Sequence, residues 1–204
     1  MSSAVLSPVL ADRLVKRNTA VTDAALVLAG AAVVGLLAQV SVPLWPVPIT
    51  GQTLGVLLVG AALGARRGAA SLLSYMLLGL VGMPWFAQFT GGLAAVAKPS
   101  FGYIIGFIPA AYLIGYLSER RWDRSWWKAV AGFGLASLIP FVFGVPYLWA
   151  VLALAGKNIG FAGAMAAGFT PFIIGGIVKW LLGAMLLPGA WKALEIFEDG
   201  RDAR

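Results

Sequence analysis

The sequence contains neither cysteine nor histidine. Without cysteine, the chain forms no disulfide and offers no thiolate to a metal ion. Without histidine, it lacks the usual zinc ligand, the usual near-neutral general base and any catalytic triad built on imidazole. It also lacks a glycine-rich nucleotide loop of the P-loop type, so it carries no motif for ATP hydrolysis. We therefore expect a protein that is not an enzyme and that uses no cofactor and no metal.

Charge is scarce as well, at 11% of the 204 residues, whereas 60% of the residues are hydrophobic. That leaves too little polar surface to cover a water-soluble globule of this length, which predicts that the chain lies in a lipid bilayer. The formal net charge of +7 is explained by membrane orientation and requires no nucleic-acid partner.

Long apolar runs predict an all-α integral membrane protein built as a bundle of six transmembrane helices, since a span needs roughly 17–25 predominantly apolar residues. The predicted spans are 24–42, 52–66, 68–84, 100–118, 127–154 and 162–188. The corresponding division of the chain is an N-terminal tail (1–23), a transmembrane domain (24–190) and a C-terminal tail (191–204).

Two local features refine these spans. A tight hairpin at 64–68 joins the second span to the third. Pro140 and Pro146 in the fifth span and Pro171 in the sixth predict kinks or broken helices there.

The basic residues predict that both termini are cytoplasmic. With the N-terminus inside, twelve of the 15 Lys and Arg lie in inside segments. They are Arg13, Lys16, Arg17, Arg66, Arg67, Arg120, Arg121, Arg124, Lys128, Lys192, Arg201 and Arg204. All eight acidic residues also lie at or inside this boundary. The outer half then carries only lysines as charges, and a cavity there would attract anions.

Lys179 is the most informative single residue. A charge inside a span is costly and usually faces a cavity. Gly175 and Gly176 lie on the same helical face and leave space in front of it, and no carboxylate in the spans can pair with it. We expect a ligand anion as its partner, the alternative being a lysine that reaches to a membrane interface.

Two further segments supply candidate ligand contacts. Residues 82–107 combine aromatic walls, an amide and a cation around glycines, which suits a small amphipathic acid or, alternatively, an interfacial aromatic belt. The candidates there are Trp85, Phe86, Gln88, Phe89, Lys98 and Tyr103. Residues 39–53 read QVSVPLWPVPITGQT, a proline-stiffened loop with Trp45, Thr50 and Gln52 that could form an outer lid or a simple connector.

Together these residues resemble the BioY family, the biotin-specific substrate-binding S component of energy-coupling factor (ECF) transporters. The PxxPVPITxQT run, the GxRRGxxSxxxY hairpin, the GxPxF segment and KPSFGYIIGF occur in order, and the resemblance covers residues 24 to 190. It implies a six-helix S component in the bacterial cytoplasmic membrane that binds biotin from outside. It also implies a T subunit, contacted by Ala25 and Ala29 on the first helix, and two ATPase subunits.

The resemblance is incomplete around the expected binding residues. Pro171, Phe172, Gly175 and Lys179 match the family's last helix, but Gly176 stands where the family has an Asp expected to accept from the ureido ring. Lys98 stands where the family usually has a small residue.

The residues still fit the parts of biotin. Lys179 and Lys98 suit the carboxylate, and Gln88 or backbone groups suit the ureido group. The apolar bicycle suits Trp45, Trp85, Phe86 and Tyr103. A solitary facilitator for biotin or a related acid, working without ATPases, is the alternative reading.

Overall fold

The computed structural model describes residues 8–15 and 19–202, with side chains described to residue 196. The described chain is almost entirely helical. The α-helices are α1 (Leu10–Leu14), α2 (Ala20–Gln39), α3 (Gln52–Leu63), α4 (Ala65–Leu80), α5 (Phe101–Ser118), α6 (Trp126–Leu154), α7 (Gly160–Gly168) and α8 (Ile173–Asp202). Short 3-10 turns occupy η1 (Ala87–Phe89), η2 (Leu93–Ala97), η3 (Trp122–Arg124) and η4 (Thr170–Phe172).

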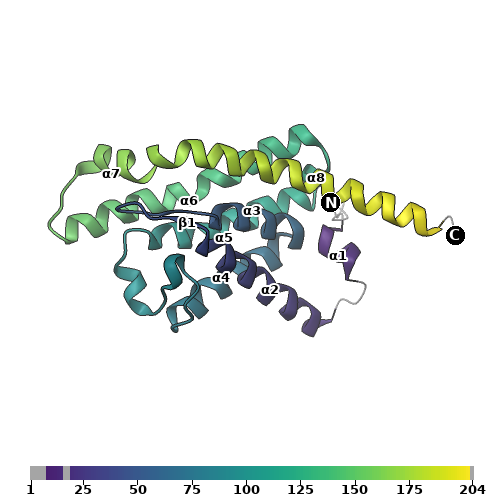
Figure 1. The fold of residues 1–204 in the computed structure, drawn as a ribbon, viewed down its shortest axis with the longest axis horizontal. Coiled ribbons are helices and arrows are strands. Elements are labelled where there is room, and N and C mark those ends of the chain that lie inside the picture. The colour runs from purple at the N-terminus through teal and green to yellow at the C-terminus, as the bar shows by residue number, and fades with distance from the viewer. Residues whose placement is uncertain (1–7, 16–18, 203–204) are drawn as a thin grey trace, which may run out of the picture.

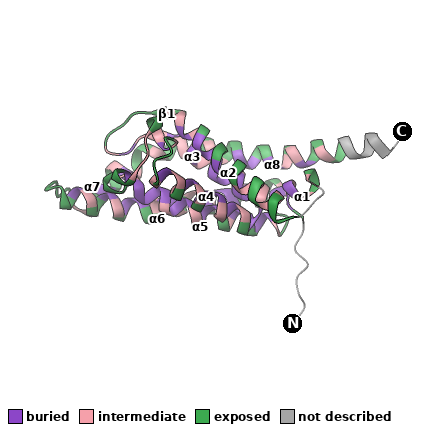
Figure 2. Ribbon diagram, turned by 90° about the horizontal axis from the view of Figure 1, so that it is seen from below, coloured by how far each residue is buried: buried purple, intermediate pink, exposed green. Residues whose placement is uncertain are grey.

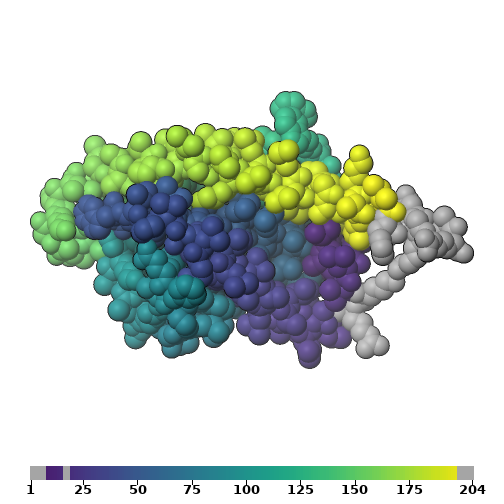
Figure 3. Space-filling model, in the orientation of Figure 1, coloured from purple at the N-terminus to yellow at the C-terminus, as the bar shows by residue number. Residues whose placement is uncertain are grey.

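The helices form an elongated bundle with two distinct ends (Figure 1). One end, here called the hairpin end, carries α7 and a small hairpin of two strands, β1 (Ser41–Val42) and β2 (Ile49–Thr50). The other, the termini end, carries α1 and the last turns of α8. Figure 3 shows the hairpin region lying against the start of the α7–α8 segment on one face.

Helix α5 is the centre of the bundle. It packs against α3, α4 and α6, and most of its residues are buried. Glycines allow the closest of these approaches: a Cβ added at Gly60 of α3 would lie 2.6 Å from the Ala111 carbonyl oxygen of α5. Small residues of this kind let membrane helices pack backbone to backbone. The α3–α4 connection is tighter than the predicted hairpin at 64–68: Gly64 alone, with a φ of 86°, separates the helices, and residues 65–68 already belong to α4.

Helix α8 is packed much less than α5. Its buried positions, Gly183, Ala184, Leu187 and Trp191, recur every three or four residues and mark one face. Between Ile173 and Leu182 no residue of α8 is buried. Figure 2 shows this contrast, with intermediate and exposed residues along much of α8. The part of α8 nearest the hairpin end therefore packs against the rest of the bundle only loosely.

The described helices match the predicted all-helical membrane architecture. Four helical stretches are long and apolar enough to cross a membrane, and α3 is a shorter apolar helix. The predicted break at Pro171 is present, since η4 separates α7 from α8. In contrast, α6 continues as one helix through Pro140 and Pro146. Helix α8 runs on to Asp202, past the predicted boundary at residue 190.

Charged side chains fix the termini end. Arg67 of α4 pairs with Asp12 of α1 at 2.6 Å and with Asp23 of α2 at 2.7 Å. Glu119, just after α5, accepts a hydrogen bond of 2.9 Å from the Ala65 backbone N–H. These contacts bring together charged residues of α1, α2 and α4 and the residue after α5, at the end of the bundle opposite the hairpin.

Candidate ligand-binding site

The proline-rich loop folds into the hairpin. Strands β1 and β2 are antiparallel, with Ser41 opposite Thr50 and Val42 opposite Ile49. The connecting residues 43–48 contain three prolines, which restrict the backbone and donate no hydrogen bond. The Gly51 N–H donates to the Val40 carbonyl oxygen at 2.8 Å and closes the base of the hairpin, from which α3 begins. The hairpin thus links α2 to α3 across the hairpin end.

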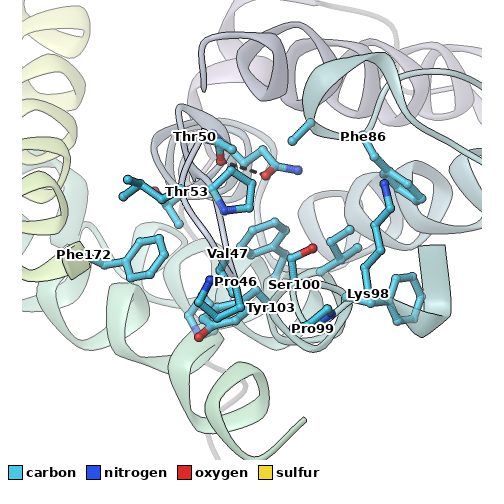
Figure 4. A pocket seen from close by; sticks show the side chains of 18 of the residues that line it. Pro46, Val47, Thr50, Thr53, Phe86, Lys98, Pro99, Ser100, Tyr103 and Phe172 are labelled. Atoms are coloured by element: carbon cyan, nitrogen blue, oxygen red, sulfur yellow. Dashed lines mark hydrogen bonds between the residues drawn. The ribbon is translucent and has the colours of Figure 1, made fainter. Parts of the chain in front are cut away.

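Beneath this loop lies a cavity of about 300 Å³, here called the hairpin cavity. Its walls come from the hairpin, the start of α3, residues 86–101, α5, α6, η4 and α8. Figure 4 shows Thr53 and Phe172 on one side of the cavity and Lys98 and Phe86 on the other. The lining is mainly apolar, with a few polar groups converging on it, as is usual for small-molecule sites.

Lys179 joins α8 to the hairpin at the edge of this cavity. Its ammonium group donates to the Thr50 carbonyl oxygen at 2.6 Å and to Thr53 Oγ1 at 3.2 Å. An ammonium has three N–H donors, so one remains for another acceptor. Lys179 is partly buried and lines the cavity. Its role as a ligand contact stays a prediction, and Lys179 also has protein partners that the sequence did not indicate.

A buried polar network supports the cavity wall next to Lys179. Thr50 Oγ1 donates to Gln52 Oε1 at 2.8 Å, and Gln52 Nε2 donates to the Tyr75 hydroxyl at 2.6 Å. The Tyr75 hydroxyl donates to the Trp85 carbonyl oxygen at 3.2 Å. Buried polar groups of this kind specify one arrangement, because each unpaired member would be costly. The network therefore fixes the hairpin, α4 and the 85–90 segment relative to one another.

Gln39, at the end of α2, holds the segment that carries Gln88, and sequence reasoning missed this role. Its Nε2 group donates to the carbonyl oxygens of Trp85 and Phe86, both at 3.2 Å, and its Oε1 accepts from the Phe89 N–H at 2.9 Å. Gln88 itself has a φ of 61°, a left-handed conformation that is uncommon outside glycine. The sequence showed that Gln88 is polar and lies between the aromatic residues Phe86 and Phe89. It did not show that Gln39 holds this segment in place.

Aromatic side chains form the wall on the α5–α6 side. The Tyr103 ring lies 5.8 Å from the Phe141 ring and 6.1 Å from the Phe172 ring. The Tyr103 hydroxyl donates to the Gly168 carbonyl oxygen at 2.7 Å, which ties α5 to the end of α7. Phe141 was not a candidate from the sequence, because nothing in an apolar helix distinguishes a cavity-lining phenylalanine from a lipid-facing one.

Trp45, in the loop of the hairpin, lies at the mouth of the cavity. Its side chain is 70% exposed, and the Lys157 ammonium lies 4.9 Å from its ring centroid. Lys157 belongs to the turn between α6 and α7, so this cation–π contact joins the hairpin loop to that turn. The contact attaches the loop predicted as a lid (residues 39–53) to the α6–α7 turn.

Most of the candidate residues meet at this cavity. Those that line it are Trp45, Gln52, Phe86, Gln88, Lys98, Tyr103 and Lys179. Trp85 does not line it: its ring lies tilted against Tyr75, with centroids 5.3 Å apart, and its Nε1 donates to the Tyr75 carbonyl oxygen at 2.9 Å. Trp85 supports the wall from behind. Its role as a ligand contact stays a prediction that this geometry does not favour.

Gly176 lies in a second, adjoining space. A groove of about 520 Å³, here called the rear groove, runs between α3, α6 and α8 and is lined by Gly176, Gly134, Leu57 and Trp180 among others. It shares Thr53, Phe141, Phe172 and Lys179 with the hairpin cavity. A Cβ added at Gly176 would meet nothing within 4 Å. The position held by an acid in the resembled family thus faces the rear groove.

Within the described residues, no group of three or more acidic side chains that could hold a metal ion is found. On α2, Ala25 and Ala29 are both exposed, whereas Ala31 and Gly35 pack inside the bundle. An exposed pair of small residues is available for a contact with another protein, but nothing in the described contacts identifies one.

The fold and the cavity define a class: a helical membrane protein with a small-molecule cavity at one end of its bundle, lined by aromatics and by lysines without acids. Residues 11–196 match the BioY family model, and the chain belongs to the BioY family.

Named relatives and a solved structure agree with this family. A "biotin transporter BioY" of Rhizobium etli is 40% identical over 159 residues, covering 74% of this chain and 82% of the relative. Its counterpart in Thermotoga maritima is 34% identical over 149 residues, covering 73% of this chain and 83% of the relative. A crystal structure described as the S-component for biotin from an ECF-type ABC transporter matches with a TM-score of 0.64 and 26% identity, covering 84% of this chain and 92% of that one. The chain is therefore an integral membrane protein of a transporter family and not of an enzyme class.

Proposed function

We propose that this protein takes up biotin, binding it in the hairpin cavity as the S component of an ECF transporter. The observation that carries the proposal is the pairing of Lys179 with an aromatic wall in one cavity of suitable size. The remaining N–H of Lys179 would bind the valerate carboxylate, and a charge-assisted bond there fixes the ligand's orientation. The bicycle would lie against Phe86 and Tyr103, and Gln88 would supply an amide to the ureido group.

The orientation proposed for the membrane places the hairpin end outside. The spans would be α2, α3, α4, α5, α6 and the interrupted unit of α7, η4 and α8, with both termini in the cytoplasm. Supporting this, Arg67, Arg120, Arg124 and Lys128 lie toward the termini end, as the positive-inside rule requires. The cavity would then open to the side from which the vitamin arrives, in the bacterial cytoplasmic membrane.

Partner subunits would supply the energy, since the chain has no nucleotide-binding motif. A membrane T subunit would contact Ala25 and Ala29 on α2, whose exposed small side chains allow close helix packing. Two ATPase subunits would complete the transporter.

Binding is tested by titrating detergent-purified protein with biotin and with biotin methyl ester in a calorimeter. We expect biotin to bind and the uncharged ester to bind at least about tenfold more weakly, because the ester loses the charge-assisted bond. Absence of biotin binding to protein that unfolds cooperatively would refute the proposal.

Transport is tested separately in liposomes. We expect biotin accumulation only when the T subunit, both ATPases and ATP are present. Uptake by the protein alone would instead support the solitary facilitator.

A further inference from the structure

The hairpin cavity has an unusual charge balance. Among its lining residues the cationic side chains are Lys98 and Lys179, and no Asp or Glu lines it. The described acidic side chains lie elsewhere: Asp12 and Asp23 pair with Arg67, Glu119 accepts a hydrogen bond from the Ala65 N–H, Asp123 contacts Trp191, and Glu195 is exposed on α8. The cavity therefore carries two positive charges that no protein carboxylate compensates.

The two lysines approach the cavity from different sides. Lys179 belongs to α8, and its ammonium lies 3.2 Å from Thr53 Oγ1. Lys98 lies between η2 and α5, and Figure 4 shows it across the cavity from Thr53. Within the described residues, the Lys98 ammonium makes no hydrogen bond and no ion pair, and its side chain is exposed at the cavity. A ligand with an anionic group at each end could bind to both cations.

A monocarboxylate bound to Lys179 would leave the exposed Lys98 without a counter-charge on the ligand. A second anionic group on the ligand would pair with Lys98, and the gain would be modest because solvent reaches this ammonium group. Biotin has a single carboxylate, and its ureido end is neutral. The lining thus complements a ligand with an acidic group at each end better than it complements biotin alone.

We propose that the hairpin cavity also binds flexible α,ω-dicarboxylates, with one carboxylate on Lys179 and the other on Lys98. The inference rests on the proposed function only in taking the same cavity as the ligand site. The apolar middle of such a ligand would lie against Phe86, Tyr103 and Phe172. Lys98, not Lys179 alone, would then decide which acids the protein accepts.

The experiment compares glutarate, pimelate and azelate, each with its own monomethyl ester, by titration of the detergent-purified protein. The ester keeps the chain and removes one charge. For the diacid whose length fits the cavity, we expect binding about three- to tenfold tighter than its ester, a modest factor because Lys98 is exposed. Lys98→Met should bring that ratio close to one. Lys128→Met, at the first turn of α6 near the termini end, should leave the ratio unchanged.

Biotin binding is measured on the same preparation. If biotin binds but every diacid binds no better than its ester, the dicarboxylate inference is overturned and the proposed function stands. If the diacids show the charge preference and biotin does not bind, the inference stands and biotin is the wrong ligand. A charge preference that survives Lys98→Met would also overturn the inference, because the second carboxylate would not be on Lys98.

Discussion

The ammonium group of Lys179 donates a 2.6 Å hydrogen bond to the carbonyl oxygen of Thr50, a residue 129 positions earlier in the chain. This bond links α8, which is loosely packed near the hairpin end, to strand β2, which forms part of the cavity wall. A single side chain thus both closes the bundle beside the cavity and presents a positive charge to it.

Replacing Lys179 with methionine keeps most of the length of the side chain and removes its ammonium group. We expect biotin affinity to fall about ten- to a hundredfold, because the carboxylate loses a charge-assisted hydrogen bond. Calorimetric titration measures the change. Lys128→Met is the matched control, since Lys128 is exposed on the first turn of α6. Equal affinity in wild type and Lys179→Met would move the carboxylate contact to another residue.

The Gln52–Tyr75 hydrogen bond is predicted to stabilise the fold. Tyr75→Phe removes a hydroxyl that accepts from Gln52 Nε2 at 2.6 Å and donates to the Trp85 carbonyl oxygen. Leaving these buried groups unpaired should cost about 1–3 kcal/mol of unfolding free energy. The midpoint of thermal unfolding in detergent measures this. Tyr112→Phe is the control, since Tyr112 is 49% exposed on α5. A Tyr75→Phe midpoint as high as that of the control would contradict the network's role.

The sequence was sufficient to predict an all-helical membrane protein, because apolar runs and prolines act locally. The length of each run, the turn at Gly64 and the break at Pro171 follow from neighbouring residues alone. Pro140 and Pro146 did not break α6, because membrane helices tolerate proline where neighbouring groups satisfy the freed carbonyls. Side-chain chemistry also identified Lys179 and Gln88 as candidates, since polar groups are rare in such a chain.

Contacts between distant segments could not be predicted in the same way. Gln39 holds residues 85–89, and Lys157 meets Trp45, yet no local pattern pairs them. Trp85 and Phe86 are adjacent in the chain, but only Phe86 lines the cavity, because successive residues of an extended segment point in opposite directions. Tertiary packing decides which of two aromatic neighbours reaches the ligand.

Gly60 and Gly176 are both helical glycines, but we expect opposite responses to alanine. At Gly60 the new methyl group would lie 2.6 Å from the Ala111 carbonyl oxygen and 2.9 Å from its Cα, so α3 and α5 must separate. This overpacking should destabilise the protein by about 1–3 kcal/mol. At Gly176 nothing lies within 4 Å, so alanine should be neutral or slightly stabilising through its higher helix propensity.

The measurement is the unfolding midpoint of the two variants side by side in one detergent. Each variant serves as the control of the other, because the chemical change is identical. A loss of stability at Gly176 comparable to that at Gly60 would show that the rear groove is closed in the folded protein.

Asp123, in the turn between α5 and α6, is predicted to make stability depend on pH. Its side chain is 1% exposed, and burial raises the pKa of its carboxyl above the ordinary 3.8, although Trp191 donates to it at 2.5 Å and Arg124 is nearby. A raised pKa in the folded state means that the native protein holds its proton more tightly than the unfolded chain. The associated stability is therefore present below the unfolded pKa and is lost as the pH rises through the folded pKa.

Asp123→Asn separates this effect from the hydrogen bond, because the amide oxygen can still accept from the Trp191 indole. We expect the unfolding midpoint of wild type to fall as the pH rises from about 3.8 upward, and that of Asp123→Asn to fall less. Glu195→Gln, at an exposed carboxyl group on α8, should follow wild type. The midpoints of all three proteins would be recorded across this pH range in one detergent. If Asp123→Asn and wild type lose stability in parallel, another group sets the dependence, and the buried carboxyl is stabilised as an anion by Trp191 and Arg124.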